Sequence, residues 1–221
     1  MKRENILWPP NFKAAIFDFD GTIAHSADVW NEVDKIFLDK RGIEWTPEFA
    51  PKIAALGFVE GARYVIEEYG FNETVPEICD EWNYLASQLY STQVSLRPGA
   101  IEYIEALKDK GIPVGLATTN NLDVLGSLRP RIDVWNIFDA VVLGDEVKKT
   151  KHFPDIYLEA ARRLNTPPEN CIVFEDIVPG INSAKKAGMI AVGLQTKDPT
   201  QNIDKMKKAS DIFIEDWIHL I

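Results

Sequence analysis

Short apolar runs alternate with helical patterns along most of this 221-residue chain, and this alternation limits the folds that it can adopt. The runs are rich in Val and Ile, and each has the length of one buried strand. They lie at residues 14–17, 114–117, 141–143, 171–174, 190–194 and 212–214. Helical patterns follow at 99–110, 155–164 and 181–187. Strands that alternate with helices predict an α/β fold with a doubly wound, mostly parallel sheet.

One long stretch, residues 27–93, breaks this rhythm. It contains helical patterns such as VWNEVDKIFLDKRG and FVEGARYVIEEYG, and no convincing strand. A helical block of this size, directly after the first strand, predicts a small α-helical cap domain inserted into the α/β core. The predicted core domain is therefore made of residues 1–26 and 94–221, with hinges near Ser26 and near residues 96–99.

Composition excludes several classes of function. Lys and Arg number 24 against 34 Asp and Glu, so the formal net charge is −10, which disfavours binding to nucleic acid. No apolar segment reaches the 18 residues of a membrane span, and the N-terminus lacks the apolar run of a secretory signal, so we expect a cytoplasmic protein with no membrane partner. Cys79 and Cys171 match no metal-ligand spacing and are expected to be reduced. The oligomeric state is left open between a monomer and a small homo-oligomer.

Polar side chains follow the apolar runs at the places where a parallel sheet binds its ligands. In an open α/β sheet, ligands lie outside the carboxyl ends of the strands. The first run leads into FDFDGT, the second into LATTN, the third into a loop that contains a lysine, and the fourth into FED. The residues in these places are Asp18, Asp20, Thr118, Thr119, Lys151, Glu175 and Asp176. Their convergence on one edge of the sheet predicts a site.

The carboxylates of this predicted site require a cation. Two unit charges about 4 Å apart repel by roughly 4 kcal/mol at an effective dielectric constant of about 20. Carboxylate oxygens with no nearby His or Cys favour Mg²⁺, which keeps some of its water and shares its other positions with a phosphate. Lys151, the hydroxyl of Thr118 and the backbone N–H groups of residues 19–22 would bind that phosphate. These residues indicate phosphoryl chemistry.

The four segments FDFDGT, LATTN, KTKHFPDIYLEAARRL and VFEDIVPGINSAKKAG, in this order, resemble the four motifs of the haloacid dehalogenase superfamily. The resemblance extends from about residue 13 to residue 217 and is to the capped phosphatases, which include the β-phosphoglucomutase-like enzymes. It implies a Rossmann-like α/β core with an inserted helical cap.

The resemblance also implies a role for each motif residue. Asp18 would be the nucleophile that forms an aspartyl-phosphate, and Asp20 the general acid and then the general base. The remaining implied roles concern phosphate and metal binding. Phosphate would be bound by Thr118, Thr119, Asn120 and Lys151, and Mg²⁺ by Asp18, Asp20, Asp176 and Glu175.

Three functions remain open on the sequence. The first is a Mg²⁺-dependent phosphatase acting on a small phosphorylated metabolite, such as a sugar phosphate or a glycolate-like acid. The second is a β-phosphoglucomutase-like enzyme, which is disfavoured because Trp30 and Glu60 stand where the mutases have His and Arg. The third is a non-catalytic scaffold with the same fold, which would be expected to lose Asp18, Asp20 or Lys151. Asp20 also disfavours a dehalogenase, because the family's dehalogenases lack this second Asp.

Overall fold

The computed structural model describes residues 11–149, 151–198 and 200–220. Residues 1–10 of the predicted core and residue 150 lie outside this part of the chain. The described residues form two compact units. One contains the residues up to His25, Ser95–Asn121 and those from Asp133 onward; the other contains Ser26–Val94 and Leu122–Ile132.

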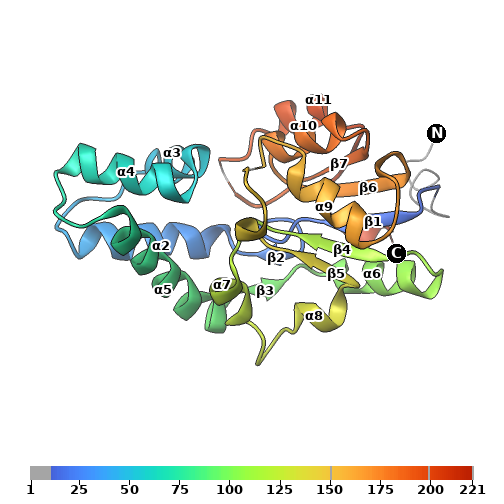
Figure 1. Ribbon diagram of the computed structural model, residues 1–221, viewed down its shortest axis with the longest axis horizontal. Coiled ribbons are helices and arrows are strands. Elements are labelled where there is room, and N and C mark those ends of the chain that lie inside the picture. The colour runs from blue at the N-terminus through green and yellow to red at the C-terminus, as the bar shows by residue number, and fades with distance from the viewer. Residues whose placement is uncertain (1–10, 150, 199, 221) are drawn as a thin grey trace. The chain divides into compact units, whose positions relative to one another are not determined.

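Six strands of the first unit form a parallel sheet in the described part of the chain, and this confirms the predicted doubly wound α/β fold (Figure 1). The strand order is β5-β4-β1-β6-β7-β8, so β1 lies between two strands that come much later in the sequence. The strands are β1 (Ala14–Phe17), β4 (Val114–Ala117), β5 (Ala140–Val142), β6 (Cys171–Glu175), β7 (Ile190–Leu194) and β8 (Ile212–Ile214). A separate antiparallel pair, which the sequence did not predict, joins β2 (Ala24–His25) to β3 (Ser95–Leu96).

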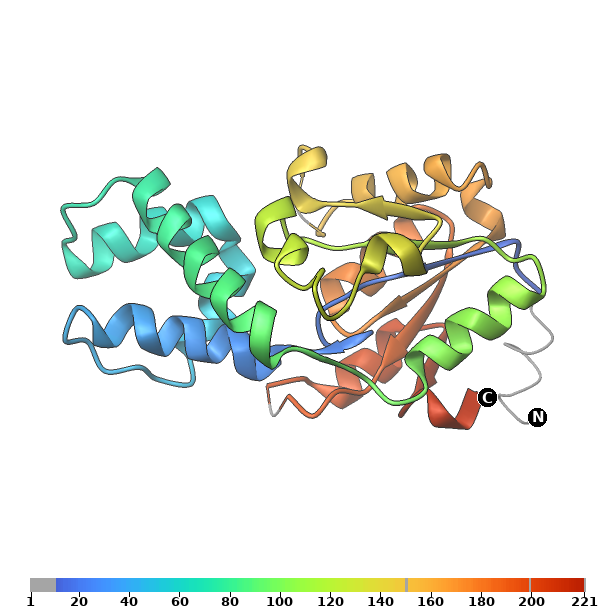
Figure 2. The ribbon, with the colours of Figure 1, turned by 90° about the horizontal axis from the view of Figure 1, so that it is seen from below.

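Strands β1 and β4 and the first four residues of β6 contain only apolar residues and glycine, because helices cover both faces of the sheet. Ala14 and Ile16 of β1 belong to a core cluster with residues of α9 (Asp155–Arg163), α10 (Val178–Lys186) and α11 (Ile203–Ala209). The opposite face packs against α6 (Ala100–Asp109), whose Tyr103 ring meets that of Phe17. Figures 1 and 2 show these two helical layers of the first unit.

An aromatic cluster lies directly beneath the carboxyl ends of β1 and β6. Phe17 and Phe174 are paired across these strands, and their rings stack with centroids 4.8 Å apart. The ring of Trp217, which is fully buried, packs against both. This rigid layer supports the residue that follows each strand.

The second unit is built from helices. Residues 26–94 form α2 (Ala27–Asp39), α3 (Phe49–Leu56), α4 (Phe58–Tyr69) and α5 (Val75–Gln93). Thr74 and Glu77 form a capping box at the start of α5, in which the Thr74 backbone N–H donates to Glu77. The short helix α7 (Leu122–Gly126) packs against α5, so residues 122–132, which the sequence predicted as core, group with this helical unit. The first unit also contains α8 (Val134–Ile137).

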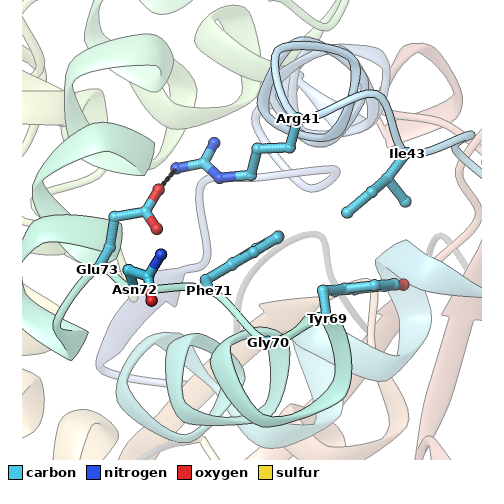
Figure 3. Close-up of a pocket in the computed structure, with 7 residues that line it drawn as sticks. All are labelled: Arg41, Ile43, Tyr69, Gly70, Phe71, Asn72 and Glu73. Carbon is cyan, nitrogen blue, oxygen red and sulfur yellow. Dashed lines mark hydrogen bonds and ion pairs between the residues drawn. The ribbon is translucent and has the colours of Figure 1, made fainter.

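A pocket of about 420 Å³ opens on the helical unit (Figure 3). The rings of Tyr69 and Phe71 line it, together with the guanidinium of Arg41. Arg41 is already neutralised, because its Nη2 lies 2.7 Å from a carboxylate oxygen of Glu73 and 2.6 Å from one of Glu81. This pocket therefore offers little attraction for a phosphate. Among the described residues, no helix is long and apolar enough to cross a membrane.

Candidate active site

The register of the sheet brings the first and fourth motifs together. Phe17 of β1 pairs with Phe174 of β6, so the next residues along, Asp18 and Glu175, lie side by side at the edge of the sheet. The backbone N–H of Asp18 donates to the carbonyl of Phe174 over 3.0 Å, which extends the ladder by one more bond. Both side chains are buried. Two adjacent carboxylates in a buried place need positive charge nearby.

Lys151 supplies the first positive charge. Its buried Nζ donates to Oδ1 of Asp18 and, over 2.6 Å, to Oε1 of Glu175. Burial alone would lower the pKa of Lys151, but the charges of Asp18 and Glu175 outweigh it and raise the pKa above its ordinary value. Lys151 is therefore a permanent cation, and these two bonds leave one of its three protons for another acceptor.

Glu175 is held by four donors. Its Oε1 accepts from Lys151 and, over 2.7 Å, from the hydroxyl of Tyr157; its Oε2 accepts from the backbone N–H groups of Asp176 and Ile177 over 2.9 and 3.0 Å. A carboxylate has about four acceptor positions, so these bonds use them all. A Cβ on Gly180 would lie 2.4 Å from this carboxyl group, which explains a glycine in the first turn of α10. Glu175 fixes Lys151 and the turn after β6.

Asp176 completes an acidic cluster. Carboxylate oxygens of Asp18, Glu175 and Asp176 all lie within 4.8 Å of one another. Gly21, with φ of +76°, closes the site from the other side, because a Cβ at that position would lie 2.0 Å from Oδ2 of Asp176. The site therefore requires a glycine at position 21 for two reasons. The backbone there has a positive φ, and it lies too close to Asp176, a candidate metal ligand, to leave room for a side chain.

The electrostatics of the cluster fit a divalent cation. Burial raises the pKa of Asp18, and the charges of Glu175 and Asp20 raise it further against the opposing effect of Lys151. Burial and the charges of Glu175 and Asp18 likewise raise the pKa of Asp176 well above its ordinary value. One ammonium is thus insufficient to stabilise the ionised cluster. Asp18 and Asp176 are oxygen ligands of the type that Mg²⁺ prefers, and they retain acceptor positions in the described part of the chain.

The remaining motif residues form a second group around Asp20. The Asp20 carboxylate, which is partly exposed, accepts a hydrogen bond of 2.7 Å from Nδ2 of the buried Asn120. The hydroxyl oxygen of the buried Thr118 accepts from the backbone N–H of Asn120 over 3.1 Å, so its own hydrogen is available to a ligand. Thr119 is exposed and takes no part in these bonds. Of the three residues LATTN contributes, Thr118 and Asn120 are thus tied to the site.

The structure adds three residues that the sequence did not single out. Tyr157 lies six positions after Lys151 within PDIYL, a segment that was matched only as a motif. The side chain of Gln201 bridges the carbonyls of Asp176 and Leu194 over 2.8 Å each. Arg97, at the predicted hinge, is buried and donates to the carbonyl of Gly21. None of these contacts has a local sequence signal, because each joins a side chain to a residue outside its own helix, strand or turn.

Comparison with known proteins identifies the family. The model for haloacid dehalogenase-like hydrolases matches residues 15–194, which include all the motif residues above. The chain belongs to the haloacid dehalogenase-like hydrolase family. This confirms the resemblance drawn from the motifs.

Relatives within this family are named as phosphatases. A bifunctional riboflavin kinase/FMN phosphatase of Arabidopsis thaliana is 33% identical over 211 residues, which are 91% of this chain and 55% of that protein. This chain thus spans about half the length of that relative. A phosphorylated carbohydrates phosphatase of Thermotoga maritima is 32% identical over 178 residues, 80% of this chain and 82% of its own length. At the level of the family, these names confirm the expectation of a phosphoric monoester hydrolase.

A solved structure gives the same picture of the fold. A putative beta-phosphoglucomutase from Thermotoga maritima superimposes with a TM-score of 0.75 at 26% identity, over 94% of this chain and 96% of that one. The α/β architecture predicted from the alternating strands and helices is therefore that of the family.

Proposed function

We propose that this protein is a Mg²⁺-dependent phosphatase that hydrolyses a small phosphorylated metabolite through a phosphoryl group carried by Asp18. One observation carries the proposal: buried Asp18, bonded to Lys151, lies at the end of β1, and two residues later Asp20 is held by Asn120. A nucleophile and a separate proton carrier on the same turn are what transfer of a phosphoryl group to and from the protein requires. We also propose that the helical segment 27–93 is the cap domain of this enzyme.

In the first step, a carboxylate oxygen of Asp18 attacks the phosphorus of the substrate, and the bond from phosphorus to the leaving oxygen breaks. Asp20, protonated at this stage, gives its proton to that oxygen, so the product leaves as an alcohol. The hydrogen bond from Asn120 holds the Asp20 side chain in place.

In the second step, Asp20 is a carboxylate and takes a proton from water. The oxygen of that water attacks phosphorus, and the bond from phosphorus to Asp18 breaks, which releases inorganic phosphate and restores both carboxyl groups. Lys151 stays protonated throughout and donates its third N–H to a phosphoryl oxygen, while the hydroxyl of Thr118 donates to another. Both groups neutralise charge that develops on the transferred phosphoryl group.

Mg²⁺ would be held by the carboxylates of Asp18 and Asp176 and by the backbone carbonyl of Asp20. When bound, it neutralises the acidic cluster and the phosphoryl oxygens. Glu175 is included in the predicted ligand set, but its four acceptor positions are occupied, so we propose that it acts by orienting Lys151.

The test of this function is a screen of phosphorylated metabolites with and without Mg²⁺. FMN and phosphorylated carbohydrates belong in the panel, because relatives are named for them. We expect phosphate release that requires the metal and is abolished in Asp18→Asn, and acid-quenched enzyme should carry a phosphoryl group on the peptide that contains Asp18. Full activity of Asp18→Asn, or activity that is unchanged in excess EDTA, would refute the proposal.

A β-phosphoglucomutase-like activity is the second candidate, favoured by the similarity to the Thermotoga maritima structure. The contacts of Trp30, which stands where the mutases have His, argue against this activity. Its indole N–H donates to the hydroxyl of Tyr90 over 3.0 Å and its ring packs against Phe58, so Trp30 belongs to the packed interior of the helical unit. Product analysis separates the two activities. A mutase converts a hexose 1-phosphate to the 6-phosphate with little free phosphate.

The cytoplasmic location and the monomer or small homo-oligomer stay predictions.

A further inference from the structure

Three consecutive carbonyls of the turn that carries Asp20 are held by donors from elsewhere in the chain. Nη1 of Arg97 donates to the carbonyl of Gly21, and the backbone N–H of Arg97 donates to that of Ile23 over 2.7 Å. Between them, the indole N–H of Trp217 donates to the carbonyl of Thr22 over 2.9 Å. Both donor side chains are buried, Arg97 with 7% of its surface exposed and Trp217 with none.

Arg97 also reaches the other side of the acidic cluster. Its Nη2 donates to the carbonyl of Gln195, just after β7, over 2.7 Å. The neighbouring carbonyl of Leu194 and the carbonyl of Asp176 both accept from the side chain of Gln201. A continuous set of hydrogen bonds thus runs from the turn of Asp20, through Arg97 and Gln201, to the turn of Asp176.

The two turns that are joined in this way meet at the site itself. The space at Gly21 is so tight that a single added carbon would lie 2.0 Å from Oδ2 of Asp176. A shift of one turn by a fraction of an ångström would therefore change the distance between Asp176 and the backbone of residues 20–21.

The bonding of Arg97 is that of a brace. Among the described residues, no carboxylate forms an ion pair with it, although the charges of Asp176 and Asp216 oppose the lowering of its pKa that burial causes. Its planar guanidinium sends two N–H groups to carbonyls on two different segments. A lysine, with a single nitrogen, has no such fork.

We infer that Arg97 is a positioning residue, which fixes the turn of Asp20 relative to Asp176. It thereby sets the positions of the groups that would bind the metal and of the Asp20 carboxylate. This inference rests on the proposed function for its effect on turnover. Its structural part, the bracing of residues 19–24, is independent of the reaction. Partners that orient metal ligands typically matter by about 10- to 100-fold in metal affinity or activity.

The first measurement is amide hydrogen exchange on the intact protein. The turn contains its own hydrogen bonds: the N–H of Gly21 donates to the carbonyl of Ala24, and those of Ile23 and Ala24 donate to the carbonyl of Phe19. In Arg97→Lys, we expect these three amides to exchange at least about tenfold faster than in the wild type, since a lysine cannot bond the Gly21 and Gln195 carbonyls at the same time. Trp217→Phe removes the donor to Thr22 and part of the buried indole ring but leaves Arg97 bonded to the Gly21 carbonyl, so it should change the same amides by less.

The second measurement is direct binding of Mg²⁺ by calorimetry in the absence of substrate. We expect Arg97→Lys to bind Mg²⁺ roughly tenfold more weakly, and kcat to fall by a similar factor with little change in KM. Arg41→Lys is the matched control. Arg41 is largely buried, with 10% of its side chain exposed, and also donates to a backbone carbonyl, that of Phe37, but it lies in the helical unit. It should leave the turn amides, Mg²⁺ binding and kcat within about twofold of the wild type.

The outcomes separate this inference from the proposed function. Unchanged exchange at Gly21, Ile23 and Ala24 in Arg97→Lys, or equal losses in Arg41→Lys, would overturn the inference even if the wild type is an active phosphatase. A wild type without Mg²⁺-dependent phosphatase activity would overturn the proposed function, while the exchange experiment still decides whether Arg97 braces the turn.

Discussion

Tyr157 acts on the site through another residue. Its hydroxyl donates to Oε1 of Glu175, the same oxygen that accepts from Lys151, and both Tyr157 and Glu175 are fully buried. Burial and the nearby charge of Glu175 raise the pKa of Tyr157 well above its ordinary value, so the phenol stays protonated and can only donate. The position of Lys151 thus depends on Glu175, and the same oxygen of Glu175 is held by the hydroxyl of Tyr157.

We expect Tyr157→Phe to lower kcat by about tenfold with little change in KM, because Oε1 of Glu175 then accepts from Lys151 alone and no longer has a fixed second donor. The unfolding free energy should fall by roughly 1–3 kcal/mol, since an acceptor position of a buried carboxylate loses its donor. Steady-state kinetics and urea denaturation measure the two effects. Tyr103→Phe is the control: the Tyr103 hydroxyl is equally buried but has no hydrogen-bond partner among the residues that the structure describes, so its removal should be neutral or stabilising. Equal losses in both variants would contradict this role.

The sequence predicted which residues gather at the site better than it predicted how they are paired. Asp18, Lys151 and Glu175 could be grouped because each follows a buried strand of a parallel sheet. The contact of Lys151 with both Asp18 and Glu175 depends on how β1 and β6 align, which no single segment encodes. Arg97 sits in SLRPGA, where nothing local distinguishes a buried brace from a surface arginine.

At the scale of elements, α2 carries a carboxyl group where its pattern calls for an apolar side chain. Val29, Val33 and Phe37 form the buried face of this helix, and Asp34 is also buried, with 7% of its surface exposed. Burial raises the pKa of Asp34 from 3.8 to about 7. Ionisation of Asp34 in the folded protein is therefore unfavourable near neutral pH.

The raised pKa of Asp34 predicts a pH-dependent stability. Below about pH 4 the carboxyl group is protonated in both states and costs nothing; between about pH 4 and 7 only the unfolded chain ionises, so the unfolding free energy falls by up to roughly 4 kcal/mol. Asp34→Asn should lose less stability than the wild type between pH 5 and pH 8 and be more stable than the wild type at pH 8, as measured by urea denaturation at the two pH values. Asp28 is exposed on the same helix, so Asp28→Asn should lose as much stability between pH 5 and pH 8 as the wild type does. A wild type whose stability is flat over this range would contradict the prediction.

The buried strands and the longer helices followed from the sequence, whereas the two-residue strands and the shortest helices did not. The strands of the sheet are continuous apolar runs because both faces are covered, and α9 is long enough to show its periodicity. The pair β2 and β3 has two residues in each strand, and α7 has five residues. Segments of this length carry no usable period. The assignment of α7 to the helical unit arises from its packing against α5, 29 or more residues earlier in the chain.

At the scale of the whole molecule, the carboxylates that would bind the metal also lower the stability of the metal-free protein. The chain carries a net charge of −10, and three of its carboxylates lie within 4.8 Å of one another at the buried edge of the sheet. Lys151 compensates only part of that charge. The raised pKa values of Asp18 and Asp176 mean that keeping both ionised near neutral pH destabilises the metal-free fold. A bound divalent cation would reverse the sign of this contribution.

We therefore expect Asp176→Asn to have opposite effects with and without metal. In EDTA near neutral pH, the variant should unfold at a higher temperature than the wild type, because a buried charge among like charges is removed. In the wild type, Mg²⁺ at about 100 times its Kd should raise the unfolding free energy by roughly 2.7 kcal/mol, and the variant should lose most of that gain.

Two controls isolate the site from the general charge. NaCl at matched ionic strength screens all the acidic groups alike, so it should reproduce little of the effect of Mg²⁺ on the wild type. Asp145→Asn removes an exposed carboxylate and should respond to Mg²⁺ as the wild type does. If Asp176→Asn is less stable than the wild type in EDTA and still gains the full stabilisation from Mg²⁺, then Asp176 is a structural residue and the metal lies elsewhere. The opposite pattern, stabilised without metal and insensitive to it, is the one that a metal ligand in a buried acidic cluster must produce.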